Sequence, residues 1–235
     1  MKYFNCIKLI ITTLLFVLLA ACGGGGGSSS TATTGTVTST LSFNVKSAYA
    51  AFVTAGVVKT FAVTGTCSGT VPLTIAPATT ATVFEGITGF SGVNVTTTNY
   101  TNCTPATSVS TMTRYYDSNY VPTGSSTTGQ YGVFLVAPTL QTSVKVGDAG
   151  VIGTQTYYTS NTKATGDGRE DNSYVIEADT ATTAIFNLIS KYYNAAGTLT
   201  LTEQDRYRIS ADNKLTFISF NLQFANGSTN NLIGN

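Results

Sequence analysis

The stretch Leu215–Phe224, with the sequence LTFISFNLQF, decides the fold class. Apolar and polar side chains alternate along it, with Ile218, Phe220, Leu222 and Phe224 in one set and Ser219, Asn221 and Gln223 in the other. A period of two predicts a β-strand with one buried face. The stretch runs into Asn226-Gly227, the preferred pair for a two-residue type I′ hairpin turn, so another strand should follow.

The segments before this strand repeat the same pattern. Arg206–Ser210 alternates in the same way, and turn residues at Asp212-Asn213 and Asn194–Gly197 separate successive strands. Earlier strands are expected at Phe61–Thr66, Val71–Ile75, Thr82–Phe84 and Val93–Thr98. Consecutive hairpins predict an all-β fold, an antiparallel meander arranged as a sandwich or an open barrel.

Two segments depart from simple alternation. Glu203 and Asp205 fall in phase with the apolar residues around them, so we expect a bulge near Thr202–Asp205 that turns both carboxyls outward. The run Asp179–Tyr193 fits a helical stripe as well as a strand. We favour a strand because the flanking pattern is β, and keep one short helix near 180–193 as the alternative.

Charge is distributed unevenly along the chain. Residues 37–108 carry only Lys46, Lys59 and Glu85, while the other charges downstream of the N-terminal segment lie in 109–235. We therefore place a soft boundary near residue 108, between a β module at 37–108 and an antiparallel meander at 109–235. A single domain over 37–235 is the alternative, because no Pro/Gly-rich linker separates the halves.

Composition excludes several function classes. The chain has 235 residues, 12 Lys and Arg against 11 Asp and Glu, and no His. A near-neutral balance lacks the basic footprint of nucleic-acid binding. The absence of His excludes a Ser-His-Asp triad, a Cys-His pair and an H-E-x-x-H zinc site. No cofactor or metal is expected, and an enzyme is disfavoured.

The N-terminal segment has the features of a secretion signal. Lys2 and Lys8 form a basic head, and the apolar run Leu9–Leu19 is too short for a permanent span of about 20 residues. It ends in Leu19-Ala20-Ala21-Cys22, which closely resembles the lipobox of bacterial lipoproteins. The resemblance implies removal of residues 1–21 as a signal peptide and acylation of Cys22.

The lipid anchor predicts where the protein resides. Each buried acyl CH₂ contributes about 0.8 kcal/mol, so two or three chains hold a domain on a membrane. Residues 22–36 form the lipidated Cys and a Gly/Ser/Thr tether with a reach of roughly 20 Å. Gly23 rather than Asp follows Cys22, so the resemblance implies the outer membrane, at its periplasmic face or the cell surface.

Cys67 and Cys103 remain after processing. An even pair in an oxidising compartment predicts a disulfide. Two free thiols are the alternative, and a metal site is less favoured because two Cys without His make a poor tetrahedral set.

Two polar motifs carry little functional weight. Ser160–Lys163 matches S-x-x-K, but a match is expected by chance in a chain this rich in Ser, and we read it as a polar loop. The acidic stretch Asp167–Asn172, followed by Glu177 and Asp179, contains carboxylates that could hydrolyse a glycosidic bond or bind Ca²⁺. We interpret it as a solvated hairpin tip.

Tyrosine offers the remaining candidate site. Adjacent tyrosines on a strand point to opposite faces, so each Tyr-Tyr pair should place one ring in the core and one outside. The candidate binding residues are Tyr115, Tyr116, Tyr120, Tyr131, Tyr157 and Tyr158. Cross-strand packing is the simpler interpretation, and the absence of Trp weighs against a dedicated sugar site.

These observations give an ordered set of functions. We expect a non-enzymatic lipoprotein with a structural or interaction role in the bacterial envelope, anchored to the membrane through Cys22. The alternative is a module that binds a glycan or an envelope protein through tyrosines. A carboxylate-dependent glycan hydrolase is the remote alternative.

Overall fold

The computed structural model describes residues 38–234 and is nearly all β. The predicted signal peptide, lipobox and tether lie outside these residues. The elements are α1 (Val45–Ala55), β1 (Val57–Gly65), β2 (Gly69–Ile75), β3 (Thr80–Phe84), β4 (Ile87–Tyr100), β5 (Thr107–Asp117), β6 (Pro122–Thr127), β7 (Gln130–Phe134), β8 (Ala149–Tyr158), β9 (Gly166–Ala178), β10 (Thr183–Asn194), β11 (Leu199–Ser210), β12 (Leu215–Phe224) and β13 (Thr229–Gly234).

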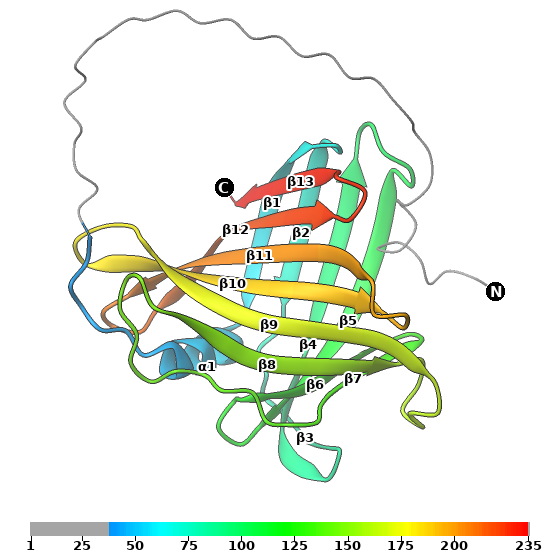
Figure 1. Cartoon of the computed structure of the whole chain (residues 1–235), viewed down its shortest axis with the longest axis horizontal. Coiled ribbons are helices and arrows are strands. Elements are labelled where there is room, and N and C mark those ends of the chain that lie inside the picture. The colour runs from blue at the N-terminus through cyan, green and yellow to red at the C-terminus, as the bar shows by residue number, and fades with distance from the viewer. Residues whose placement is uncertain (1–37, 235) are drawn as a thin grey trace, which may run out of the picture.

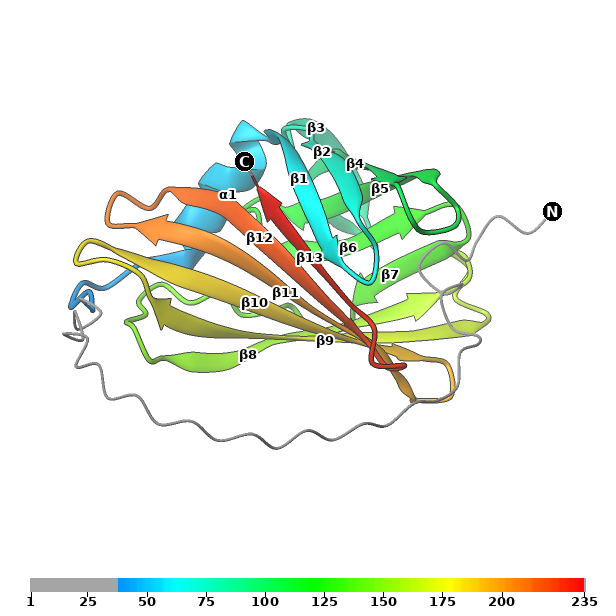
Figure 2. The ribbon, with the colours of Figure 1, turned by 90° about the horizontal axis from the view of Figure 1, so that it is seen from above.

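The strands form one antiparallel sheet that closes on itself. From β4 to β13 each strand pairs with the next along the chain, β13 pairs with β1, and β1 pairs with β2. The further pairing of β2 with β4 completes a closed 12-strand barrel, with β3 as an extra strand on β4. In Figure 1 the front strands β8–β12 cross steeply over β1, β2, β4 and β5. Figure 2 shows the same barrel from above.

Both predicted halves of the chain build this one ring. Phe61 of β1 pairs with Gly234 of β13, and β4 pairs with β5 from Gly89–Asp117 to Asn99–Thr107. The boundary placed near residue 108 therefore falls within β5, where Ser108 pairs with Thr98 of β4. The barrel forms as one unit because neither half can close without the other.

The strand predicted at 180–193 is present as β10, and no helix forms there. The bulge expected at Thr202–Asp205 is wrong, because β11 pairs with β10 without interruption through these residues. The bulge lies in β12 instead, where Arg206 and Tyr207 face Ser219 and Phe217. Phe217, rather than Ile218, therefore joins the inner apolar set of β12, and its side chain is 3% exposed.

The hairpin after β12 is also built differently from the prediction. Gly227 has a φ of 84°, but Asn226 is not among the residues with positive φ, as a type I′ turn requires at both positions. The Gly227 N–H donates to the Phe224 carbonyl at 2.9 Å, so a turn over Phe224–Gly227 ends in a left-handed glycine. The strands still pair as the pattern predicts.

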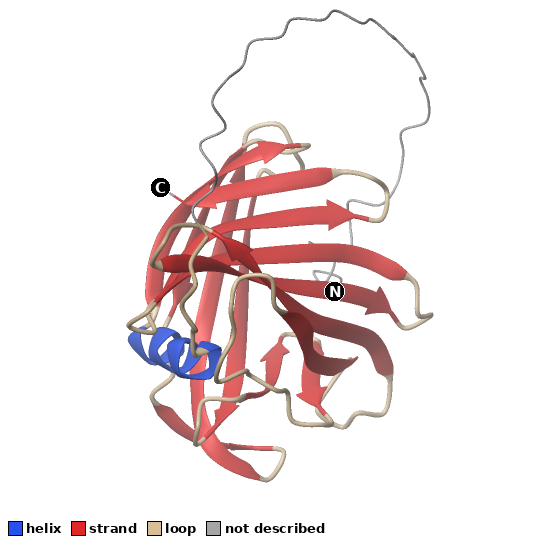
Figure 3. Ribbon diagram, turned by 60° about the vertical axis from the view of Figure 1, so that its left-hand side comes forward, coloured by secondary structure: helices blue, strands red, loops and turns tan. Residues whose placement is uncertain are grey.

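The helix α1 was not predicted. The Asn44 side chain accepts a hydrogen bond from the Ser47 N–H at 2.9 Å, which caps the helix. Val45, Ala48, Phe52 and Val53 are buried at helical spacing. Figure 3 shows the helix lying against one end of the barrel.

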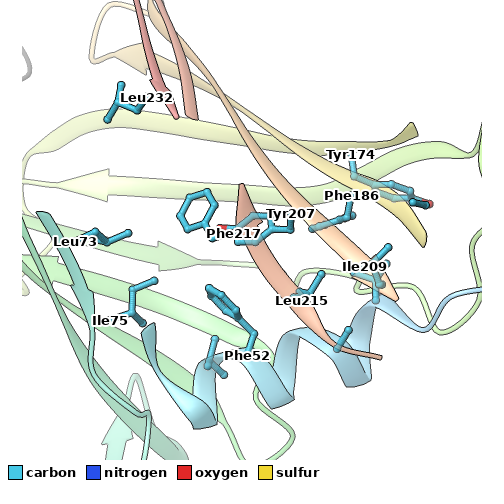
Figure 4. Close-up of a cluster of buried hydrophobic side chains, with 14 of the residues drawn as sticks. Phe52, Leu73, Ile75, Tyr174, Phe186, Tyr207, Ile209, Leu215, Phe217 and Leu232 are labelled. Atoms are coloured by element: carbon cyan, nitrogen blue, oxygen red, sulfur yellow. The ribbon is translucent and has the colours of Figure 1, made fainter. Parts of the chain in front are cut away.

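The helix and the inner faces of the strands share one apolar core at this end. The Phe52 ring meets Tyr207 edge-on at 5.4 Å between centroids, and Tyr207 stacks on Phe217 at 4.4 Å. Figure 4 shows these rings with Phe186 and Leu215 above the helix. Aromatic contacts of this kind fill the helix end of the barrel.

The predicted disulfide is confirmed at the other end. Cys67 bonds Cys103, with the two Cα atoms 5.6 Å apart. It joins the β1–β2 turn to the β4–β5 turn, and the Cys67 N–H donates to Asn230 Oδ1 at 2.8 Å. The bond fixes the strand ends where the ring closes.

Removing this disulfide should weaken the whole barrel. The double variant C67S/C103S opens the loop that the disulfide closes between two residues 36 positions apart. The free energy of unfolding should therefore fall by about 4 kcal/mol. Urea denaturation under oxidising conditions measures the change. Unchanged stability would mean that the bond does not restrain the unfolded chain.

Truncating the helix anchor should also destabilise the fold. Phe52→Ala leaves a cavity against Tyr207 and should cost about 3–5 kcal/mol. Val58→Ala is the control, because Val58 is 84% exposed and its loss should cost under about 0.5 kcal/mol. Equal costs for the two variants would show that α1 does not pack on the barrel.

Candidate binding site in the barrel lumen

Four charged side chains lie on the inner face of the barrel wall. Arg114 of β5 is two residues from Tyr116, which is buried and belongs to the core. Glu170 of β9 is in phase with buried Asn172, Tyr174 and Ile176. Glu203 and Asp205 of β11 are in phase with buried Leu201 and Tyr207. The closed ring therefore places one guanidinium and three carboxyls inside.

Tyrosine hydroxyls surround these groups. The Tyr157 hydroxyl donates to a Glu170 carboxylate oxygen, and the Tyr192 hydroxyl donates to Glu203 Oε2 at 3.1 Å. Tyr49 reaches the cluster from α1, where its ring lies 6.4 Å from that of Tyr116. The cluster thus draws side chains from the helix and from β5, β8, β9, β10 and β11.

Neutral polar side chains complete this inner layer. Gln155 Nε2 donates to Ser125 Oγ at 2.7 Å, and Ser190 Oγ donates to Asn172 Oδ1 at 2.7 Å. Gly132 lies beneath Gln155 and Tyr157, and an added Cβ would come within 2.2 Å of Gln155 Nε2. The glycine therefore lets both long side chains occupy the lumen.

Burial changes the ionisation of the two β11 carboxyls. It raises the pKa of Glu203, and it raises the pKa of Asp205 well above its ordinary range, with repulsion from Glu203 adding to the effect. The two side chains hydrogen-bond to each other, so the pair is arranged to share a proton.

Arg114 stays charged in this setting. Burial opposes its charge, but the acidic groups around it, Tyr49, Tyr116 and Glu170, raise the Arg114 pKa. The site is therefore a fixed cation facing a carboxyl pair that can change its charge. Perturbed carboxyls with a defined charge partner are typical of functional sites.

One polar atom of the cluster lacks a hydrogen-bond partner, and three of its side chains keep some solvent exposure. Asp205 Oδ1 is buried and has no hydrogen-bond partner within the described chain. Arg114, Glu203 and Asp205 each keep intermediate solvent exposure, although all three are on the inner face. Solvent therefore reaches part of each of these three side chains.

A track of small polar side chains leads away from the cluster. Along β4 and β5 the inner face beyond Arg114 carries the apolar Met112 and the polar Asn94, Thr96, Thr98, Ser108 and Ser110, all partly or fully exposed. Thr98 and Ser108 hydrogen-bond across the two strands at 2.6 Å. β6 pairs only with Thr113–Tyr116 of β5, so the adjoining wall ends there and this hydroxyl track reaches solvent.

The predicted tyrosines divide between the two faces of the wall. The expected alternation is confirmed for two pairs: Tyr116 and Tyr157 are 3% and 7% exposed inside, while Tyr115 and Tyr158 are half-buried on the opposite face. Outside, Phe84 stacks on Tyr115 at 4.0 Å and also meets Tyr131. Tyr120 stacks on Phe90 at 5.1 Å.

The structure therefore does not gather the predicted tyrosines into one exposed surface. Sequence reasoning missed the luminal partners Arg114, Glu170, Glu203 and Asp205. The signal was present, because Glu203 and Asp205 fall in phase with apolar neighbours, but it was read as a bulge.

The acidic stretch is not a hairpin tip, because Gly166–Ala178 is strand β9. Its alternation sends Glu170 inward, whereas Glu177 pairs outside with Arg206 at 3.2 Å. The Arg208 guanidinium, 2.6 Å from Asp179, lowers the pKa of that carboxyl. Ser160–Lys163 lies in the β8–β9 loop, as predicted, and Lys163 pairs with Glu85.

Two further features of the described residues bear on the site. No group of three or more Cys, Asp or Glu side chains between residues 38 and 234 is arranged to hold a metal ion. Over the same residues, no helix has the length and apolarity needed to cross a membrane.

Asp205 should lower the stability of the protein at neutral pH. Because the folded state holds the shared proton more tightly than the unfolded chain, the free energy of unfolding falls as pH rises above about 4. The variant Asp205→Asn should therefore raise the free energy of unfolding by about 1–3 kcal/mol at pH 8 and change it little at pH 4. Urea denaturation at both pH values measures the difference.

The control for this variant is Asp171→Asn on the outer face, where Asp171 pairs with Arg169 at 3.1 Å. It should change stability by less than about 1 kcal/mol. If Asp205→Asn destabilised the protein equally at pH 4 and pH 8, the raised pKa of Asp205 would be refuted.

No protein-family model matches the chain, and neither the curated proteins nor the solved structures contain a match to it.

Proposed function

We propose that this protein is a non-enzymatic, lipid-anchored binding protein of the bacterial outer membrane that holds a small, hydroxyl-rich ligand in its barrel. The anchor is the lipidated Cys22 expected from the lipobox. The ligand class follows from the lumen, where the carboxyl pair, Arg114 and the tyrosines meet an accessible track of hydroxyls. Saccharide units present the matching hydroxyl groups and stack on aromatic rings.

The Asp205 Oδ1 atom, a buried carboxyl oxygen without a hydrogen-bond partner in the described chain, is the observation that carries this proposal. Buried charges without full pairing cost stability, and well-packed apolar residues in their place are often neutral or stabilising. A protein keeps such groups where function needs them. Of the three buried side-chain oxygens without a hydrogen-bond partner in the described chain, Asp205 Oδ1 is the one that belongs to a carboxyl.

The mutual hydrogen bond of the Glu203 and Asp205 carboxyls supports binding rather than hydrolysis. Glycosidases place two carboxyls on either side of the scissile bond, about 5–10 Å apart. Glu203 and Asp205 instead come from one strand face, two residues apart, and hydrogen-bond to each other. The outer carboxyls Glu177 and Asp179 are engaged by Arg206 and Arg208.

A blocked track should abolish binding. Ser110→Trp places a large ring on the inner face of β5, whereas Thr111→Trp places the same ring on the outer face one residue away. We expect the full chain in detergent to bind one or more of glucose, N-acetylglucosamine and glucosamine. The affinity should fall at least tenfold in Ser110→Trp and remain unchanged in Thr111→Trp.

Tyrosine emission is a suitable readout, because the chain has 13 Tyr and no Trp and five tyrosines surround the site. For the two Trp variants, binding is measured by calorimetry instead of tyrosine emission. Equal binding by both variants would place the ligand outside the barrel. No binding of any of these saccharides would sink the proposed ligand class.

A further inference from the structure

We propose that the ligand carries a protonated amine and that Glu203 and Asp205 receive it, so that the preferred ligands are amino sugars or similar hydroxylated amines. The inference rests on the proposed function, and it names the ligand group that the luminal charges select. It follows from three observations of the described residues: the charge balance, the open acceptor on Asp205, and the aromatic surroundings.

The charge balance of the lumen favours a cation. Glu170, Glu203 and Asp205 face one guanidinium, that of Arg114. The other inner-facing base, Lys59, lies at the helix end, where its Nζ donates to the Phe217 carbonyl at 2.9 Å. The carboxyls therefore outnumber the cation available to them, and an added positive charge is attracted.

The hydrogen-bonding capacity of the site points the same way. Asp205 Oδ1 is a buried acceptor without a donor. A carboxylate only accepts, and an ammonium group offers three donors and no acceptor. A ligand hydroxyl could supply one donor, but an ammonium also neutralises the charge that makes the bare carboxyl unfavourable.

The walls around the pair are suited to an organic ammonium. Tyr49 approaches from α1, Tyr157 from β8 and Tyr192 from β10, while Tyr207 lies next to Asp205 on the inner face of β11. The electron-rich faces of such rings attract a cation by about 0.5–2 kcal/mol. Glu170 from β9 and Arg114 from β5 complete the charged surroundings.

Amine binding should release a proton. A bound ammonium stabilises both groups as carboxylates and so opposes the raised pKa of each. A proton held between the two carboxyls then leaves to solvent while the ligand keeps its own. Binding should therefore strengthen with rising pH until the ligand amine itself loses its proton.

The test compares two ligands that differ at one position: glucosamine, with an ammonium at C2, and glucose, with a hydroxyl there. Calorimetry uses the full chain in detergent at pH 6.5, in two buffers of different ionisation enthalpy. We expect glucosamine to bind at least tenfold more tightly than glucose, with release of up to about one proton per site. Asp205→Asn should remove this preference, and Asp171→Asn should keep it.

The outcomes separate this inference from the proposed function. If glucose bound as tightly as glucosamine and Ser110→Trp abolished both, the lumen would be a saccharide site and the amine inference would be wrong. If glucosamine bound equally to wild type, Asp205→Asn and Ser110→Trp, it would adsorb to the outer surface, and both proposals would be overturned. The stabilisation expected for Asp205→Asn separates lost binding from lost folding.

Discussion

The pairing of β1 with β13, together with that of β2 with β4, is the constraint on which the rest of the structure depends. These contacts join the two ends of a meander that otherwise pairs each strand with its neighbour. Closure gives the sheet an inside, and every alternating strand then has one luminal and one outer face. The disulfide between Cys67 and Cys103 lies beside this closure and joins the β1–β2 turn to the β4–β5 turn.

Closure also explains why the two ends of the barrel differ. The helix α1 and the aromatic side chains of β10, β11 and β12 fill one end with an apolar core. In the other direction β6 ends after covering four residues of β5, and the inner hydroxyls of β4 and β5 remain accessible. The charged cluster lies between these regions, so it is shielded from one side and reachable from the other.

The strands could be predicted from the sequence because their alternation is local. The period of two in Leu215–Phe224 and the turns after β10 and β11 are visible without the fold. The inward direction of Glu203 and Asp205 was also encoded in their phase. The same phase predicts a bulge if the interior is a filled apolar core, because a core of that kind would exclude both carboxyls. A barrel of 12 strands has room for them.

Other features could not be found from a local pattern. The closing pair Phe61–Gly234 joins residues 173 positions apart in the chain, and no periodicity marks it. The bulge at Ile218 arises from the fit of β12 to β11, so the sequence alone favours the wrong inner residue. The helix α1 is short and depends on burial against β12, although the Asn44 cap and the spacing of Val45, Ala48 and Phe52 were readable.

The luminal ligand site is the central claim, and a ¹³C NMR titration of the side-chain carboxyls tests it most directly. The full chain, labelled at Asp and Glu, would be titrated with and without glucosamine. We predict that in the free protein Asp205 titrates well above its ordinary range and Glu203 above its ordinary value, and that glucosamine shifts both titrations toward lower pH. Ordinary titration of both groups, unaffected by the amine, would contradict the account.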